Sequence, residues 1–209
     1  MISANEDFRR KVQQYADGHG GKIYAPIPHP DFEGFPSVQG HDRFDMIKPF
    51  IPGSAKSALD IGAHWGYSSH RLTEMGLEVT AVENSKEAIY FINEIQKITG
   101  VHYKLITDSI LDIDPGQYHL VIALNIFHHF LKLEVRYKKF IQFLSRLQCR
   151  TMIYQSHNIG EGQMKNAYKN FSDDDFCRFI VDNSVLTDWK YIATYSNRKI
   201  YLIWQTIDS

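Results

Sequence analysis

The segment ALDIGAHWGYSS, residues 58–69, places a carboxylate and two glycines where a buried strand should turn into a helix. Gly62 and Gly66 allow a sharp turn and let a ligand approach the backbone. A dinucleotide site would have a middle glycine, so that pyrophosphate meets the helix N-terminus, but His64 stands there. Asp60 would repel pyrophosphate and attract a cation. The segment therefore indicates a ligand with positive charge and no phosphate, such as an ammonium or sulfonium.

Acidic residues also end the next two expected strands. Glu83 ends the strand at 77–83, where a carboxylate can accept hydrogen bonds from both hydroxyls of a ribose. The same place would suit NAD, or a carboxylate that merely lies at an exposed helix cap. Asp108 and Ser109 end the following strand, and Asp108 could accept a hydrogen bond from the exocyclic amine of an adenine. The alternative for Asp108 is an ordinary turn residue.

These residues depend on a regular alternation of strands and helices. Strands are expected at 57–61, 77–83, 101–108, 118–127 and 150–156, and helices at 68–76, 84–100, 132–148 and 171–183. Asn84 and Glu87 would cap the second of these helices. Val135 should face the core from the third, together with Phe140 and Leu144. Two final strands at 189–195 and 200–206 form a hairpin. The alternation predicts a parallel α/β sheet covered by helices on both faces, with an antiparallel strand added by the hairpin.

The N-terminal part has a different composition. Residues 5–16 read as a short amphipathic helix, and residues 17–40 are rich in Gly and Pro and should be irregular. A long loop of this kind is either a lid over a site or an ordered extension on the surface. A further helix is expected at 41–51. We divide the chain into an N-terminal helix and cap, 1–42, and a main domain, 43–209.

Composition narrows the classes of protein. The chain has 209 residues, which suits one domain, and its net charge of −1 gives no global indication of nucleic acid or an anionic membrane. Its two cysteines form no CxxC pair, which fits a reducing cytoplasm. The polar N-terminus is not a secretory signal, and no apolar run approaches the roughly 18 residues of a membrane span. We expect a cytoplasmic protein without membrane segments.

The motifs together resemble those of the class I S-adenosylmethionine-dependent methyltransferases, from about Arg43 to the C-terminus. LDIGAHWGYSS, VTAVEN, ITDSI and VIALNIFHHF look like four successive motifs of that family. The resemblance implies a Rossmann-like seven-stranded, mostly parallel α/β sheet with an antiparallel terminal hairpin, and S-adenosyl-L-methionine as cofactor. The implied cofactor-binding residues are Arg43, Asp60, Gly62, Ala63, His64, Gly66, Tyr67, Glu83, Asn84, Asp108, Ser109 and Asn125.

Candidate catalytic residues follow the fourth and fifth strands. Asn125 would lie near the methyl group and could orient an acceptor. His128 and His129 come next, and since adjacent side chains diverge, at most one should face the site as a base. The alternative is a buried core histidine. His157, Glu161 and Gln163 lie in a loop expected to line the acceptor pocket, or simply to cover the surface. No compact HxxxH or HxxE pattern supports a metal.

The acceptor is less determined than the cofactor. A small-molecule or sugar hydroxyl is the first hypothesis, and a tRNA base is the second. The YAPIP…QGHDRF segment resembles methyltransferases of tRNA wobble uridines, and makes Gln39 and Arg43 candidates for the cofactor carboxylate. Basic residues at 132–150 could contact phosphates or form a solvated helix face. An NAD-dependent oxidoreductase and a non-catalytic cofactor-binding protein stay open as other classes. The sequence leaves the oligomeric state undetermined.

Overall fold

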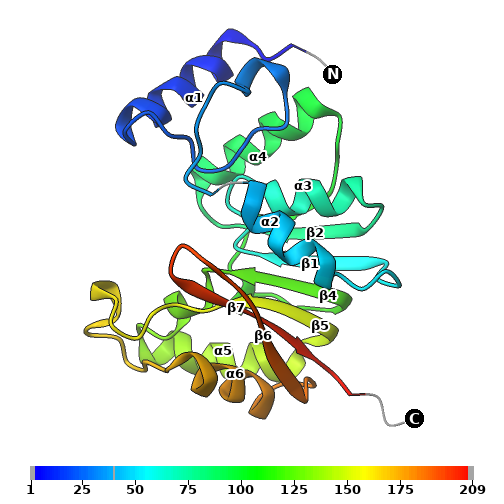
Figure 1. Ribbon diagram of the computed structural model, residues 1–209, viewed down its shortest axis with the longest axis vertical. Helices are drawn as coiled ribbons and strands as arrows, with labels where there is room; N and C mark the ends of the chain where they lie inside the picture. The colour runs from blue at the N-terminus through cyan, green and yellow to red at the C-terminus, as the bar shows by residue number, and fades with distance from the viewer. Residues whose placement is uncertain (1–2, 40, 207–209) are drawn as a thin grey trace.

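The computed structural model describes residues 3–39 and 41–206, and its centre is a seven-stranded sheet with the order β3-β2-β1-β4-β5-β7-β6 (Figure 1). β7 runs antiparallel to both of its neighbours, while the remaining adjacent pairs are parallel. The strands are β1 (Ser57–Ile61), β2 (Glu78–Val82), β3 (Lys104–Ile106), β4 (Gln117–Leu124), β5 (Gln148–Gln155), β6 (Asp188–Tyr195) and β7 (Arg198–Trp204). The α/β sheet with a terminal hairpin that the sequence predicts is confirmed.

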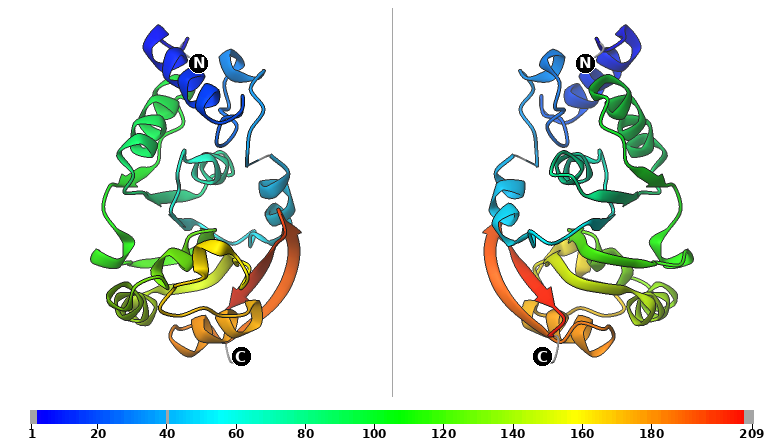
Figure 2. Two further views of the ribbon diagram at one scale, coloured as in Figure 1. Left: turned by 90° about the vertical axis from the view of Figure 1, so that its left-hand side faces the viewer. Right: turned by 90° about the vertical axis from the view of Figure 1, so that its right-hand side faces the viewer.

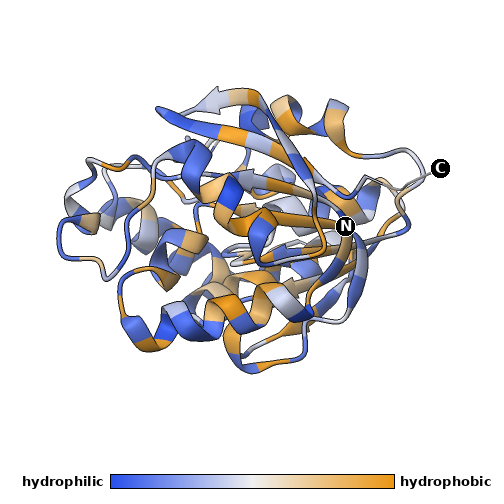
Figure 3. Cartoon of the chain, turned by 90° about the horizontal axis from the view of Figure 1, so that it is seen from below, coloured by the Kyte–Doolittle hydropathy of each residue, from blue (hydrophilic) through white to orange (hydrophobic). Residues whose placement is uncertain are grey.

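Six α-helices are described along residues 3–39 and 41–206, and four of them closely follow the expected amphipathic segments. They are α1 (Glu6–Gly18), α2 (His41–Ile47), α3 (Tyr67–Glu74), α4 (Lys86–Thr99), α5 (Glu134–Arg146) and α6 (Asp173–Asp182). Figure 3 shows hydrophilic and hydrophobic residues interspersed along these helices, as helices packed on a sheet require. In this part of the chain, none of the helices combines the length and the apolar character needed to cross a membrane.

The two faces of the sheet carry separate apolar cores. Leu59, Val121 and Met152 point toward α5 and α6, in a cluster that also includes Phe140 and Phe176. Their strand neighbours point the other way, toward α2 and α3, as the alternation of side chains along a strand dictates. Figure 1 shows α5 and α6 on one side of the sheet, and α2, α3 and α4 on the other. The order of strands reverses between β1 and β4, and the carboxyl ends of these two strands therefore border a crevice.

The N-terminal segment is an ordered extension in this structure. Phe8 of α1 lies against Phe91 of α4, with ring centroids 6.0 Å apart, and Trp65 stacks on the same Phe91 ring at 4.0 Å. Residues 19–39 fold back on themselves through a bridge between Ile23 and Ser37. Figure 2 shows α1 alongside α4 at one end of the molecule. The cap therefore packs on the helix that follows β2, close to the turn after β1.

Two local expectations are wrong. Ser85, not Asn84, caps α4: its side chain accepts from the Ala88 amide, while the Asn84 amide donates to the Glu83 carboxylate. The helix therefore starts one residue later, and Glu87 no longer occupies the capping-box position. Val135 is 61% exposed instead of buried. At about 100° per residue it lies on the side of α5 opposite Leu144, which does reach the core.

The cap of α4 gives a test of local stability. Ser85→Ala removes the acceptor for an orphan helix amide and should lower the free energy of unfolding by about 0.5–2 kcal/mol. Asn84→Ala is the matched control, because its side chain does not cap the helix, and should change stability by less than about 0.5 kcal/mol. Urea unfolding of both variants measures the difference. A larger loss for Asn84→Ala than for Ser85→Ala would contradict the assignment of the cap.

Candidate active site

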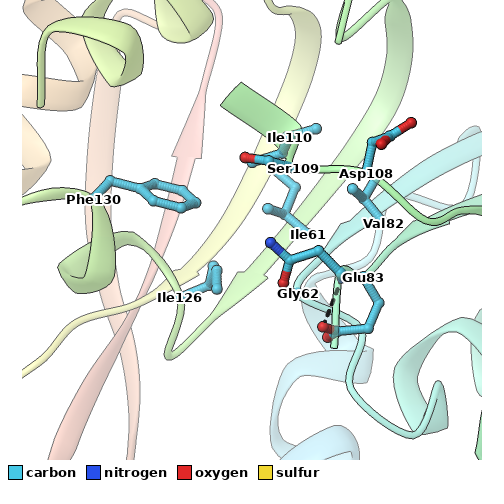
Figure 4. A pocket seen from close by; sticks show the side chains of 10 residues that line it. Ile61, Gly62, Val82, Glu83, Asp108, Ser109, Ile110, Ile126 and Phe130 are labelled. Carbon is cyan, nitrogen blue, oxygen red and sulfur yellow. Dashed lines mark hydrogen bonds between the residues drawn. The ribbon is translucent and has the colours of Figure 1, made fainter. Parts of the chain in front are cut away.

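Two cavities at the carboxyl edge of the sheet meet at Gly62. The outer cavity is lined by Ile61, Gly62, Val82, Glu83, Asn84, Asp108, Ser109, Ile110, Ile126 and Phe130 (Figure 4). The inner cavity is lined by Tyr24, Ala25, Arg43, Asp60, Gly62, Ala63, Tyr67, Ser68 and Leu124. Nine residues assigned to a cofactor from the sequence thus line one cavity or the other, and Gly62 lines both. Side chains from separate strand ends converge here because the strands are parallel.

Both glycines of the turn after β1 are needed for geometric reasons. Gly62 has φ +70°, and a Cβ atom there would lie 2.8 Å from Cδ1 of Ile126, which lines the outer cavity. Gly66 has φ +76°, and a Cβ atom would lie 2.0 Å from the Tyr103 hydroxyl. Such left-handed backbone favours glycine, and neither position has room for a side chain. Gly62 therefore shapes the site directly, whereas Gly66 allows the start of α3 to pack on Tyr103.

Asp60 is a buried carboxylate at the end of the central strand β1. The Ser69 hydroxyl of α3 donates to its Oδ2 at 2.7 Å. Burial raises the pKa of Asp60 to about 6, an effect that the Ser69 hydrogen bond and the charge of Arg43 partly offset. Arg43 reaches the same region from α2, where its Nη1 donates to Gln155 Oε1 at 3.4 Å. The inner cavity therefore contains one acidic and one basic group, which suits a ligand carrying both charges.

Glu83 ties the glycine turn to the start of α4. Its Oε2 accepts from the His64 amide at 2.9 Å, and its Oε1 accepts from the amides of Asn84 and Ser85 at 2.8 Å each. A carboxylate offers about four lone-pair sites. With three amides bound, a diol ligand would have to share or replace at least one of them. Glu83 thus orders the chain just before α4 and also lies on the wall of the outer cavity.

Several buried polar atoms near this turn have no partner within the described segments. They are Nδ1 of His64, Oδ1 of Asn125 and Oε1 of Gln39. An unsatisfied buried polar group costs about 1–3 kcal/mol, so each is a place where a ligand atom would be stabilising. His64 and Asn125 also have positive φ angles of 52° and 59°. Strained backbone and unpaired polar atoms together are typical of functional sites.

The ring of His64 is covered by the cap. Tyr24 stacks on it with ring centroids 3.3 Å apart, and Tyr24 also lines the inner cavity. Burial lowers the pKa of His64 to about 4, so the imidazole is neutral at pH 7. Tyr67, which lines the same cavity, is held by a hydrogen bond between its hydroxyl and His41 Nδ1 at 2.7 Å. The cap and α2 therefore complete the inner cavity that the turn after β1 begins.

The far wall of the outer cavity is formed by residues after β3 and β4. Asp108 is exposed at its margin, and Ser109 caps the short 3₁₀ helix that follows. Figure 4 shows Phe130 and Asp108 on opposite sides of the cavity. Ile110, Ile126 and Phe130 supply apolar surface between polar groups, an arrangement suited to a flat aromatic ring.

Three histidines predicted as catalytic lie together beyond the end of β4. The rings of His128 and His129 have centroids 4.0 Å apart, and His128 lies 5.8 Å from His157. His128 and His157 are buried, and His157 Nε2 is 2.8 Å from Asn170 Oδ1. Burial and neighbouring basic groups lower the pKa of His128 to about 3. The structure thus groups these side chains, with His128 neutral at pH 7.

Glu161 is held by a network of partners. Nε and Nη2 of Arg198 donate to its two oxygens at 2.7 Å each, and Gln163 Nε2 donates at 2.6 Å. Burial raises the pKa of Glu161, but hydrogen bonds from Asn158, Gln163 and Arg198 outweigh it, and the net shift is downward. Its acceptor positions are therefore occupied. This arrangement favours Glu161 as a residue that positions the loop after β5, and leaves the histidines as the stronger candidates for a base.

Some site residues are not evident from the sequence. Tyr24 and Arg198 reach the site by tertiary contacts from the cap and from β7. Tyr24 begins the YAPIP segment, whose resemblance to methyltransferases is the one signal for it in the sequence, and no pattern indicates Arg198. Ile126 lines the outer cavity and directly follows Asn125 at the end of an expected strand, but its residue type does not mark it as a site residue. Over residues 3–39 and 41–206, no group of three or more His, Cys, Asp or Glu side chains is placed to hold a metal ion.

Comparisons with known proteins show which solved structures share this fold. No protein-family model and no curated protein matches the chain by sequence. Among solved structures, the bifunctional kinase-methyltransferase WbdD aligns with TM-score 0.71 and 18% identity, over 92% of this chain and 46% of that chain. The chain spans about half the length of the solved WbdD chains. The N-terminal domain of EvdMO1 with SAH bound aligns with TM-score 0.64 and 13% identity, over 95% of this chain and 97% of that chain.

A third match is the magnesium protoporphyrin IX methyltransferase ChlM from Synechocystis PCC 6803 with bound SAM. It aligns with TM-score 0.57 and 17% identity, over 78% of this chain and 76% of that chain. With its strand order and its reversed strand β7, the chain has the fold of the class I S-adenosylmethionine-dependent methyltransferases. The fold expected from the sequence motifs is confirmed.

The raised pKa of Asp60 predicts a pH-dependent stability. Because the folded chain binds this proton more tightly than the unfolded chain, the free energy of unfolding should fall as the pH rises through the interval from 3.8 to about 6. That interval corresponds to about 3 kcal/mol at 1.36 kcal/mol per pH unit. Asp60→Asn should remove this decline in urea unfolding measured from pH 4 to pH 7. The exposed control Asp42→Asn should follow the wild type, and parallel curves for Asp60→Asn would contradict the prediction.

Proposed function

We propose that the protein is a methyltransferase that uses S-adenosyl-L-methionine and acts on a small-molecule or sugar hydroxyl. The observation that carries the proposal is the pair of cavities joined at Gly62, with Asp60 on the wall of the inner cavity and Glu83 on the wall of the outer one. Support comes from solved structures with the same fold, one with bound SAM and one with SAH. The cavities lie at the carboxyl edge of the sheet, where ligands of open α/β folds bind.

The residues present fit this cofactor group by group. Glu83 would take the ribose hydroxyls, and the apolar surface of Ile110, Ile126 and Phe130 would take the adenine. In the inner cavity, Arg43 would bind the methionine carboxylate, and Asp60 would favour its ammonium group. The unpaired polar atoms of His64, Asn125 and Gln39 offer further places for hydrogen bonds. When bound, S-adenosylmethionine supplies a methyl group already activated by its sulfonium.

The protein's own task is then to align the acceptor and to take its proton. Alignment alone can contribute roughly 7–11 kcal/mol to lowering the barrier. His129 Nδ1 lies 3.4 Å from the Lys132 ammonium, which can only donate, so this nitrogen acts as an acceptor for Lys132. His128 and His157 are then the histidines whose remaining lone pairs could accept the proton of a hydroxyl. Since a base works best with a pKa near the working pH, the lowered pKa of His128 must rise when the acceptor binds.

Two alternative functions, methylation of a tRNA base and an NAD-dependent reaction, receive less support. Lys138 pairs with Glu134 at 2.8 Å, and Lys139 pairs with Asp112, so two of the six basic residues at 132–150 are neutralised within the chain. This favours a solvated helix face over a surface for tRNA. An NAD enzyme would place pyrophosphate at the turn where Asp60 is buried and the imidazole of His64 is stacked under Tyr24. Both features disfavour a doubly charged phosphate group.

Calorimetric titration with S-adenosylmethionine, S-adenosylhomocysteine and NAD, in parallel, tests the class of ligand. We expect the first two to bind and NAD not to bind. Binding of NAD alone would overturn the proposal. Samples that bind the cofactor can then be screened for acceptors with a methyl-labelled donor, starting from small hydroxylated compounds and including unmodified tRNA as the competing class.

Glu83 gives the sharpest test by substitution. Glu83→Gln keeps the size of the side chain but removes the charge, so the loss of a charge-assisted hydrogen bond should weaken S-adenosylhomocysteine binding by about 1.5–3 kcal/mol. Glu87→Gln is the matched control, since Glu87 carries the same charge in the first turn of α4 and is exposed. It should leave the affinity unchanged. Equal affinities for the wild type and Glu83→Gln would refute the ribose assignment.

A further inference from the structure

Basic side chains from several elements surround the three histidines. We call Lys132, Arg136 and Arg198 the cationic rim. Lys132 follows the 3₁₀ helix Phe127–Phe130, Arg136 belongs to α5, and Arg198 opens β7. Because β7 is antiparallel to β5, its first residue lies at the edge of the sheet where β4 and β5 end. The rim is therefore assembled by the topology of the sheet, on the acceptor side of the proposed site.

The titratable groups that act on the pKa values of His128 and His129 are all basic. After burial, the neighbours that lower the pKa of His128 are His129, Arg198, His157 and Lys132, all of them basic. For His129 they are Lys132, Arg136 and Arg198. The nearby carboxylate of Glu161 is fully engaged by Arg198 and by amide donors. Glu161 therefore compensates the charge of Arg198, but within the described residues no carboxylate pairs with the partly buried Lys132. Its uncompensated positive charge favours a ligand of negative charge.

Donors remain for such a ligand. The Lys132 ammonium has three N–H groups, of which one points to His129 Nδ1 at 3.4 Å and one to Gln163 Oε1 at 3.1 Å. Arg198 uses one N–H of Nε and one of Nη2 for the two oxygens of Glu161, and the other N–H groups of its guanidinium can donate to a further acceptor.

Lys132 differs from the other lysines of this region. Lys138 and Lys139 form ion pairs with Glu134 and Asp112. Within the described part of the chain, Lys132 forms no ion pair with a carboxylate, and its recorded contacts are with neutral groups. A charge on a partly buried side chain, left without a counter-ion, is costly unless a ligand supplies one. The contrast between Lys132 and Lys138 locates the unbalanced charge at the histidines instead of on the outer helix face.

We propose that the acceptor carries an anionic group, a phosphate or a carboxylate, and that this group binds between Lys132, His129 and Arg198. The group would anchor the acceptor, so that another part of the molecule meets the methyl donor. That it belongs to a methyl acceptor rests on the proposed function, but the anion site itself can be measured without the cofactor. The substrate class becomes a phosphorylated or carboxylated small molecule or sugar.

Calorimetric titrations with phenyl phosphate, benzoate and phenol test the anion site. These probes share one ring, and only the first two carry a charge at pH 7. We expect phenyl phosphate or benzoate to bind and phenol not to bind, and the tighter of the two anions identifies the group. Lys132→Met should weaken anion binding tenfold or more, because a charge-assisted hydrogen bond is lost. Lys138→Met, the matched control from the same basic region, should change the affinity less than twofold.

The location of the anion is read from the imidazole resonances of histidine-labelled protein. Shifts of the His129 signals on addition of the anion are expected. No binding by either anion, equal losses in the two lysine variants, or unmoved His129 signals would overturn the proposal. Lys132→Gln serves as a second variant if Lys132→Met does not fold. S-adenosylhomocysteine titrated into the same samples separates the two questions: anion binding without cofactor binding would remove the proposed methyl transfer but leave the anion site.

Discussion

The burial of the Asp60 carboxylate at the end of the central strand constrains the rest of the site. A buried charge is costly unless it has hydrogen bonds and opposite charge nearby. Ser69 supplies the hydrogen bond from α3, and Arg43 supplies the charge from α2. Arg43 is in turn held by Gln155 at the end of β5. One carboxylate thus links the helices before and after β1 to a strand two places away in the sheet.

Residues with strained backbone lie at the same edge of the sheet. Positive φ angles occur at Gly62, His64 and Asn125, in the turns that follow β1 and β4. For His64 and Asn125 such a conformation is unfavourable, and their buried polar atoms lack partners in the described structure. Large apolar clusters on both faces of the sheet hold these turns in place. The packed strands and helices therefore supply most of the stability. The strained turns and unpaired polar atoms of the site lower the local stability, but they give it a shape that can receive a ligand.

A structural feature can be predicted from this sequence where it depends on residues that are neighbours along the chain. The strands, the hairpin and the carboxylates at strand ends are local patterns, so Asp60, Glu83 and Asp108 could be placed at one edge from the alternation alone. Ser85 instead of Asn84 as the helix cap depends on the hydrogen bond between the Asn84 amide and Glu83, which a residue pattern does not encode. Tyr24 and Arg198 reach the site through the docking of the cap and the reversal of β7. Those contacts exist only in the folded chain.

The net charge of −1 conceals a separation of charge along this edge. The ends of β1, β2 and β3 carry Asp60, Glu83 and Asp108, whereas the segments after β4 and β5 and the start of β7 carry the cationic rim and the histidines. A cationic methyl donor on the acidic side and an anionic acceptor on the basic side would each meet the field that favours it. Opposed fields of this kind also discriminate against the reverse placement of the two ligands. The turn at Asn125, between the two halves, is then the natural place for the donor and the acceptor to meet.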